Sequence, residues 1–334
     1  LALETESARL EDVLPHARDA LRAIDLIDDL EDRIQQALDL NWSGAIPLYE
    51  PVADTFKLPA HPGRMDIIAA DGSQIYPDRH SLALYYLINI GSIVYQHGID
   101  QAPTCNSWPY IFFESNELYD GDHIIGSTEV DTRRDVAEIA ELRRCASHVA
   151  DAVPSIALLD NGLLLHGAPY SRRDHKYDIA LMEYLSELDS LQATGVALAG
   201  VIDRPRASQV LGLAHLSGLP RDNITQESLQ SLGKLVRLSD AMLFSNLDPG
   251  ERSALFASGS YNNLKHYQPK KHKVCFFYVN VGQIDGPISI LRVEVPEWVA
   301  QDSDKMHLVH AAVVEQCRAT DGFPYVLIRA HELA

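Results

Sequence analysis

Two short apolar runs that each end in an aspartate constrain this chain more than any other feature. The first lies in "MDIIAADGSQIYPDRH" (residues 65–80), where it leads to Asp71, and the second is "SIALLD" (155–160), which ends in Asp160. Apolar runs of this length are typical of buried strands. Asp-Gly is also a common turn signal, and Asn-Gly follows the second aspartate, so both residues have a simple turn as the alternative. The two runs therefore predict buried strands that end either in ordinary turns or in a polar site.

The order of the expected elements indicates the fold class. After residue 64 the pattern predicts three strands with short connections, and then strands alternating with helices. Short connections suit antiparallel pairing, and crossover helices suit parallel strands. The order β-β-β-α-β-α-β is that of the RNase H-like fold, an α/β fold with a mixed sheet flanked by helices. The expected elements are strands 65–71, 82–96 and 110–114, a loop at 119–126, helix 131–152, strand 155–160, helix 174–194 and strand 195–203.

Both ends of the chain add to this core. Apolar residues at three-to-four spacing over residues 6–40 predict a long amphipathic helix, broken near Pro15. A connector rich in proline and glycine follows. We therefore expect an N-terminal helical arm and connector (1–63) and one larger domain (64–334) that closes with an α+β extension. The extension contains a probable hairpin, formed by "VCFFYVNVG" and "ISILRVEV", and a helix near 305–319.

Composition limits the class of protein. The chain has 334 residues, of which 46% are hydrophobic and 22% charged, as in ordinary globular proteins. Its longest apolar run, at 82–95, is too short to span a bilayer. The four cysteines form no CxxC pair, and the acidic N-terminus has no signal-peptide pattern. These features predict a cytoplasmic protein without membrane partners.

The charge of the chain is strongly negative but unevenly spread. The net charge is −19, and residues 1–50 contribute eight of these charges, with twelve acidic residues against four arginines. This balance argues against general attraction to nucleic acid. The clustered basic residues permit a local phosphate-binding channel, although solvated surface charge is the plainer interpretation of any one cluster. The clusters are Arg133-Arg134, Arg143-Arg144, Arg172-Arg173 with His175-Lys176, Arg204 with Arg206, and "KHYQPKKHK" (265–273).

The predicted fold would bring the two aspartates together. In an RNase H-like sheet the first and fourth strands are neighbours, so Asp71 and Asp160 would lie side by side. Adjacent carboxylates repel each other unless a cation or a proton joins them, and Mg²⁺ and Mn²⁺ prefer oxygen ligands. Glu138 lies near the edge of the apolar face of the predicted helix, whereas Glu141 falls toward the solvated side. A solvent-facing glutamate remains the alternative for Glu138.

Carboxylates that hold two divalent ions are typical of phosphodiester cleavage. One ion lowers the pKa of an attacking water, and the other stabilises the leaving oxygen. The sequence contains no P-loop, no GxGxxG after a strand, no HExxH and no GxSxG. His166 follows Asp160 by six residues with no cysteine near enough to suggest zinc, and nothing singles out partners for Ser73 as a nucleophile.

Several stretches together resemble the NurA family of DNA-repair nucleases. They occur in order over nearly the whole chain from about residue 65, and the ordered set is more specific than any member alone. The stretches are "IIAADGS" (67–73), "AEIAEL" (137–142), "ALLDNGLLL" (157–165), "ALAGVIDRP" (197–205), "LDPGERSALF" (247–256) and "GFPYVLIRAHELA" (322–334).

The resemblance implies an RNase H-like core and a nuclease that acts on DNA with Mn²⁺, or with Mg²⁺ as the alternative ion. It also implies exonuclease activity with single-strand endonuclease activity as a further option, a homodimer, and work with a HerA-type hexameric ATPase in resection of double-strand breaks. Carried over by position, the family's catalytic and metal-binding residues are Asp71, Glu138, Asp160 and His331, with Asp240 as a looser match for a further metal ligand.

The sequence departs from the family pattern after the strand at 195–203. Many members have a lysine there, whereas this chain has Asp203-Arg204-Pro205-Arg206. Arg204 could face a phosphate, or Asp203 could join the acidic cluster. Tyr76 could stack on a base or simply pack in the strand. The residues predicted to contact DNA are Tyr76, Arg204, Arg206, Lys270, Lys271 and Lys273.

Two other functions remain open at this level. One is a catalytically silent DNA-binding or assembly subunit of an ATPase complex, and the other is a metal-dependent phosphohydrolase of small nucleotides. Activity with a divalent ion distinguishes the first from a nuclease, and a comparison of polymeric DNA with free nucleotides distinguishes the second.

Overall fold

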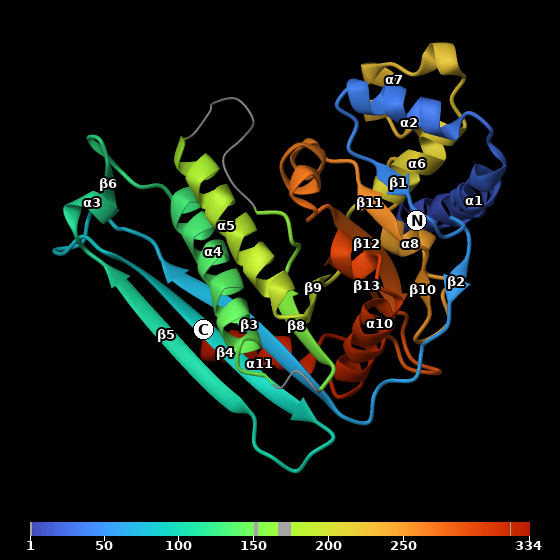
Figure 1. The fold of residues 1–334 in the computed structure, drawn as a ribbon. Helices are drawn as coiled ribbons and strands as arrows, with labels where there is room; N and C mark the ends of the chain where they lie inside the picture. The colour runs from blue at the N-terminus through green and yellow to red at the C-terminus, as the bar shows by residue number, and fades with distance from the viewer. Residues whose placement is uncertain (1, 150–152, 166–174, 321) are drawn as a thin grey trace. The chain divides into compact units, whose positions relative to one another are not determined.

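The structure is a computed structural model that describes residues 2–149, 153–165, 175–320 and 322–334 (Figure 1). The chain forms two compact units, each built from two segments. Unit 1 comprises Leu1–Pro59 and Ile202–Gln301, and unit 2 comprises Ala60–Val201 and Asp302–Ala334. Arg172, Arg173 and His166, which the sequence analysis singled out, lie outside the described residues, as do residues 150–152 of the expected helix.

A mixed sheet forms the centre of unit 2, in the strand order β5-β4-β3-β8-β9. The first three strands pair antiparallel, and β3 with β8 and β8 with β9 pair parallel. This confirms the predicted strand order, with the first and fourth core strands as neighbours. The bounds are β3 (Met65–Ile75), β4 (Tyr86–His97), β5 (Thr104–Phe112), β8 (Ser155–Asp160) and β9 (Ala197–Ile202).

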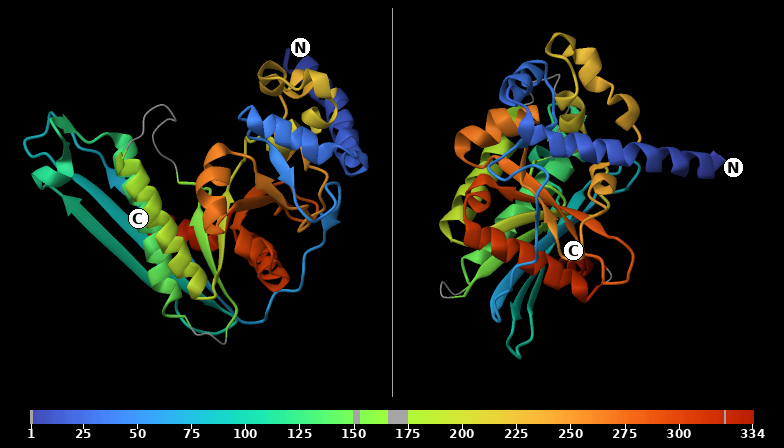
Figure 2. Two further views of the ribbon diagram at one scale, coloured as in Figure 1. Left: turned by 45° about the horizontal axis from the view of Figure 1, so that its top comes forward. Right: turned by 90° about the vertical axis from the view of Figure 1, so that its right-hand side faces the viewer.

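Helices cover both faces of this sheet. Helix α4 (Ser127–Ala146) packs on β3 and β4 and runs beside α5 (His175–Ala193) (Figure 2). Helix α11 (Tyr325–Leu333) packs on the same two strands from the opposite face, next to α10 (Ser303–Arg318). The expected loop at 119–126 contains the short hairpin of β6 (Tyr119–Asp120) and β7 (His123–Ile124), after α3 (Ser115–Leu118).

Unit 1 is built around the predicted hairpin. Strands β12 (Val274–Asn280) and β13 (Ile290–Pro296) pair antiparallel along their whole length. The shorter strands extend this sheet, and helices from both ends of the unit enclose an apolar core. The remaining elements are α1 (Ala2–Ala23), α2 (Leu30–Asp39), β1 (Ala45–Pro47), β2 (Thr55–Phe56), α6 (Gln209–Ser217), α7 (Gln226–Gln230), α8 (Asp240–Leu243), β10 (Arg252–Ser253), β11 (Phe256–Ser258) and α9 (Glu297–Ala300). Short 3₁₀ turns lie at 24–26, 221–223, 233–235 and 268–270, and a π-turn at 263–267.

The N-terminal segment differs from its expectation. Helix α1 continues through Pro15, and the break comes between Ala23 and Leu30 instead. Ala17 and Leu21 are buried in one cluster with residues of α6, so residues 1–59 form part of a compact unit rather than an arm of their own. Burial of this face outweighs the hydrogen bond that a proline removes from a helix.

The segment Asp71-Gly72-Ser73 also differs from its expectation, because it is not a turn. Strand β3 continues to Ile75, and the residues after Asp71 pair in register with β4 up to Leu87. The Asp-Gly signal is overridden by a strand partner long enough to pair with it. After Asp160, by contrast, Asn161 has a φ of 76°, which confirms that a turn follows that strand and that asparagine accepts it. In the described part of the chain, no helix combines the length and apolar character needed to cross a bilayer.

Candidate active site

The register of β3 and β8 brings the two predicted aspartates together. Ala70 pairs with Leu159 in the parallel ladder, so Asp71 and Asp160 occupy the next position on each strand. Because side chains alternate between the faces of a sheet, both aspartates point to the same face, and neighbouring strands lie about 4.8 Å apart. The predicted carboxylate pair therefore lies at neighbouring positions on adjacent strands, where Asp71 contacts α11 and Asp160 lines a cavity together with residues of α4.

Helix α11 brings the predicted histidine to this pair. The Nδ1 atom of His331 lies 2.6 Å from Oδ2 of Asp71, although the two residues are 260 positions apart in the chain. The Asp71 side chain is largely buried, whereas the His331 side chain is 76% exposed. With Nδ1 bound to the carboxylate, Nε2 is the ring nitrogen that remains available to exchange a proton.

A glycine on β4 allows α11 to approach the sheet. Gly91 pairs with Asp71, and a Cβ atom at this position would lie 2.4 Å from the carbonyl oxygen of Ala330 and 2.5 Å from the nitrogen of Ala334. These are backbone atoms, so no side-chain movement can make room. Two further hydrogen bonds fix the end of the helix. The Ser73 hydroxyl donates to the Ala334 carbonyl at 2.6 Å, and the Asn89 amide donates to the same oxygen at 2.5 Å.

Glu138 reaches the site from the opposite face. It lies over Gly72, where an added Cβ would come within 2.7 Å of its Oε1 atom. The side chain is buried, and this burial raises the pKa of Glu138 well above its usual value. The charges of Asp135, Asp71 and Asp160 raise it further, while that of Arg134 opposes them. The interaction with both aspartates places Glu138 in the same electrostatic cluster.

Arg134 is a site residue that sequence reasoning treated only as part of a basic pair. Its Nε atom lies 3.1 Å from Oε1 of Glu138, its NH2 group 2.8 Å from Asp135, and its NH1 group donates to Gln74 at 2.9 Å. The spacing of four residues between Arg134 and Glu138 on one helix was the signal that could have identified the pair. Arg134 partly neutralises the acidic cluster and holds Glu138 in place.

A cavity of about 340 Å³ opens beside the cluster. Four acidic residues from α4 and β8 line it, and Arg134 lines it as well. These acids are Asp131, Asp135, Glu138 and Asp160. Tyr76 lies at the same cavity, and its hydroxyl donates to Asp131 at 2.6 Å. A concave surface with this many carboxyl groups attracts cations and repels an uncompensated phosphate.

The donor set fits a hard divalent cation. Carboxylate oxygens from two adjacent strands and from a buried helix glutamate are the ligands that Mg²⁺ and Mn²⁺ prefer. A cation would also offset the burial and the neighbouring negative charges that raise the pKa of Glu138. Within the described residues, no three of these acidic-cluster side chains have ligand atoms that all lie within 4.8 Å of one another.

The structure places Glu141 differently from its expectation. Its side chain is buried rather than solvated, and it accepts hydrogen bonds from Ser92 at 2.5 Å and from Arg144 at 2.6 Å. Burial raises the pKa of Glu141, but the bonds from Arg144 and Ser92 outweigh it and the net pKa is lowered. Glu141 therefore fixes α4 on β4, and its oxygens are already engaged.

Asp240 belongs to unit 1, whereas the other predicted ligands belong to unit 2. Its two oxygens accept hydrogen bonds from the backbone of Val210 and Leu211, and the Tyr278 hydroxyl donates to it at 2.9 Å. The residue is fully buried. These contacts join α6, α8 and β12, so the structure gives Asp240 a place in the core of unit 1 and not in the acidic cluster.

The basic residues predicted to contact DNA also lie in unit 1. Arg204, Arg206, Lys270 and Lys271 are exposed, and Arg204 lies beside Asp203 at 3.4 Å, with a positive φ of 44°. The ammonium group of Lys273 lies 2.7 Å from the Glu297 carboxylate, and the two groups form a largely buried ion pair. Lys273 is therefore the least suited of these residues to bind a phosphate.

Comparison with known proteins supplies an independent view. The crystal structure of the NurA nuclease from Sulfolobus solfataricus is similar, with a TM-score of 0.51 and 10% identity, over 99% of this chain and 90% of that one. The catalytic domain of human endonuclease V gives a TM-score of 0.36 and 13% identity, over 89% and 90% of the two chains. No curated protein sequence matches the chain. A model of the NurA domain family matches residues 65–334, well over half of the sequence, and the protein therefore belongs to the NurA family.

Proposed function

We propose that the protein is a divalent-metal-dependent nuclease that cleaves phosphodiester bonds of DNA. The observation that carries this proposal is the placement of Asp71 and Asp160 at adjacent positions on β3 and β8, with His331 in contact with Asp71. Membership of the NurA family supports a nuclease role. An acidic pair with a third, buried carboxyl repels a polyanionic substrate. Such a substrate can react there only when cations lie between the carboxylates and its phosphates.

The proposed roles follow from the contacts of each residue. Asp71, Asp160 and Glu138 would hold the divalent ions, which supply an activated water and stabilise the leaving oxygen. His331 keeps Asp71 oriented through Nδ1 and can take up or release a proton at Nε2. Arg134 balances part of the charge at Glu138.

The finer features of the proposal rest on the resemblance of the sequence to the family. These are the use of Mn²⁺ with Mg²⁺ as the alternative, exonuclease action on DNA ends with single-strand endonuclease activity as an option, a homodimer, and a HerA-type hexameric ATPase as partner. The exposed residues Arg204, Arg206, Lys270 and Lys271, together with Tyr76, are proposed to contact DNA. Phosphate contacts of this kind weaken as salt increases.

The choice of substrate tests the proposed function. End-labelled single-stranded DNA, duplex DNA and free nucleotides are incubated with the protein and Mn²⁺, beside the Asp160→Asn variant. We expect the wild type to degrade labelled DNA and to leave free nucleotides intact, and the variant to lose most of this activity. Hydrolysis of nucleotides without degradation of DNA would indicate a small-molecule phosphohydrolase, and no activity with either would indicate a silent subunit.

A further inference from the structure

We propose that unit 2 contains a second metal site, which binds a transition-metal ion of the zinc class, apart from the acidic cluster. The ligands are His61, His97 and Glu315. One ligand atom from each of these residues lies within 4.8 Å of the other two, and this is the one such group of three found among the described residues. Nothing in the proposed nuclease reaction uses these side chains.

The orientation of His61 suits a metal ligand. Its Nδ1 atom lies 2.9 Å from the carbonyl oxygen of Pro62, to which it can donate a proton. That bond leaves the lone pair on Nε2, and this atom points to Glu315, with 3.9 Å between Nε2 and Oε2. A histidine that binds a metal through one nitrogen usually donates its other N–H to a carbonyl or carboxylate. The ring of His97 stands nearly perpendicular to that of His61, with 5.3 Å between centroids.

The backbone holds these residues together. His97 ends β4 and pairs with Met65, so the chain that enters β3 passes close to it. Gly98 follows with a φ of 84°, and a Cβ there would lie 1.9 Å from the carbonyl oxygen of Gly63. This close packing fixes the segment that carries His61. Glu315 comes from α10, where Arg318 also contacts its Oε2 atom at 2.7 Å.

The ligand types decide which ion the site would take. Two imidazoles and one carboxylate are borderline-soft donors that suit Zn²⁺, which commonly uses three protein ligands and keeps one position for water. The acidic cluster, by contrast, offers carboxylate oxygens and one imidazole, that of His331. Asp71 lies six positions after Met65 along β3, which corresponds to about 20 Å in an extended strand. The two sites are therefore distinct.

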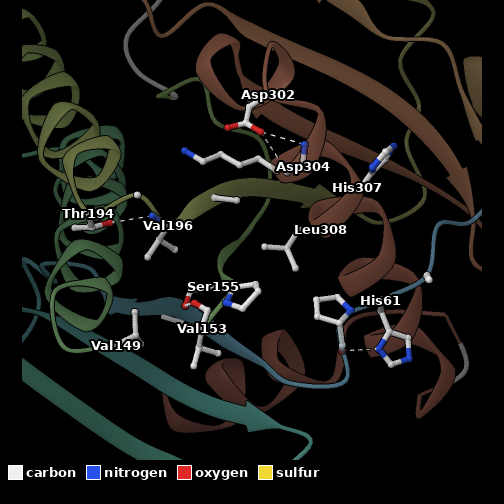
Figure 3. Close-up of a pocket in the computed structure, with 16 residues that line it drawn as sticks. His61, Val149, Val153, Ser155, Thr194, Val196, Asp302, Asp304, His307 and Leu308 are labelled. Atoms are coloured by element: carbon white, nitrogen blue, oxygen red, sulfur yellow. Dashed lines mark hydrogen bonds between the residues drawn. The ribbon is translucent and has the colours of Figure 1, made fainter. Parts of the chain in front are cut away.

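One of the three ligands, His61, lines a large cavity in the same unit. The cavity has a volume of about 840 Å³, and His61 and the first turns of α10 are among the parts that line it. Figure 3 shows His61 among the side chains that line this cavity, with its ring nitrogen bonded to the neighbouring carbonyl. A bound ion would tie together the segment before β3, the end of β4 and α10.

Metal binding by the full-length chain tests this proposal. Zn²⁺ affinity and stoichiometry are measured by competition with a chromophoric chelator, and Co²⁺ is added as a spectroscopic probe. Three variants are compared with the wild type. His97→Ala removes one imidazole, Glu315→Gln removes the carboxylate with little change of shape, and His307→Ala, an exposed histidine on the same helix, is the matched control.

We expect the wild type and His307→Ala to bind one Zn²⁺ that His97→Ala and Glu315→Gln bind at least tenfold more weakly. The same two variants should lose the intense visible absorption of Co²⁺ in a low-coordinate site with nitrogen ligands, which an oxygen-ligated ion at the acidic cluster does not give. Zn²⁺ should raise the melting temperature of the wild type and of His307→Ala more than that of the other two. Equal zinc affinity in all four proteins, or the absence of zinc binding by the wild type, would overturn the proposal.

Discussion

At the scale of single residues, the raised pKa of Glu138 is the feature that most affects the acidic site. Burial and three neighbouring acids raise the pKa of this carboxyl, so its charged form is disfavoured in the metal-free protein relative to an exposed glutamate. A divalent cation favours the charged form and would displace the proton. In the proposed function, the same residue therefore carries a cost in stability without metal and would contribute a ligand with it.

This predicts the behaviour of Glu138→Gln without metal. Because the folded-state pKa lies above the unfolded value, the folded protein binds more protons once the pH exceeds about 4.3, and the wild type loses stability as the pH rises toward the folded pKa. Glutamine does not titrate. In the presence of EDTA, the melting temperature of the variant should exceed that of the wild type by more at about pH 8 than at about pH 5.

Glu183→Gln provides the control. Glu183 is exposed, so the difference in melting temperature between this variant and the wild type should not grow with pH. Addition of Mn²⁺ should raise the melting temperature of the wild type more than that of Glu138→Gln. A variant that melts below the wild type at the higher pH would show that the charged form of Glu138 stabilises the metal-free fold, contrary to this account.

At the residue scale, the sequence predicted some partners and missed others for identifiable reasons. Asp71 and Asp160 followed from strand order, because register alone decides their proximity. His331 was identified as a site residue only through the family resemblance, and its contact with Asp71 was not predicted, since local pattern holds no information on a contact across 260 residues. Glu141 was assigned to the solvated side because the helix pattern alone does not show the polar partners that β4 and β5 provide for it, Ser92 and Trp108.

The docking of α11 onto β4 is the feature that matters most at the scale of elements. The helix delivers His331 only because Gly91 leaves room for its carboxy-terminal turn. The helical pattern of residues 322–334 does not reveal this close approach, because the residue that permits it, Gly91, lies in a distant strand. Similarly, Asp-Gly in residues 71–72 indicated a turn, whereas pairing with β4 keeps the strand extended.

Replacement of Gly91 by alanine tests this docking. The added Cβ meets backbone atoms of Ala330 and Ala334 and cannot be accommodated without moving α11. Overpacking of this kind typically costs about 1–3 kcal/mol. We expect a lower free energy of unfolding in urea, together with a loss of Mn²⁺-dependent nuclease activity at temperatures where the variant is still folded.

Gly126→Ala is the matched control, because nothing lies within 4 Å of a Cβ at that position. Because it creates no clash, its cost should be limited to the poorer capping by alanine at this helix N-cap, about 1 kcal/mol or less, and it should leave nuclease activity intact. Wild-type stability and activity in Gly91→Ala would show that α11 does not need this close approach.

At the scale of the whole molecule, the order of core elements was predictable and the organisation into units was not. The order β-β-β-α-β-α-β and the hairpin of β12 and β13 followed from periodicity and connection length. The N-terminal helices were expected to form an arm because their apolar face has no visible partner in the sequence. In the structure that face packs on residues about 200 positions away, such as Val210 and Leu213.

The central claim, that the carboxylate pair on β3 and β8 performs metal-dependent cleavage of DNA, is tested most directly by one assay. End-labelled DNA is digested with Mn²⁺ by the wild type, by Asp71→Asn, and by Asp78→Asn, an exposed aspartate in the segment after β3. All three proteins are first shown to have equal melting temperatures in EDTA. We predict that Asp71→Asn loses at least a hundredfold in rate, equivalent to about 2.7 kcal/mol of transition-state stabilisation, while Asp78→Asn cleaves like the wild type. Equal cleavage by Asp71→Asn and the wild type would contradict the account.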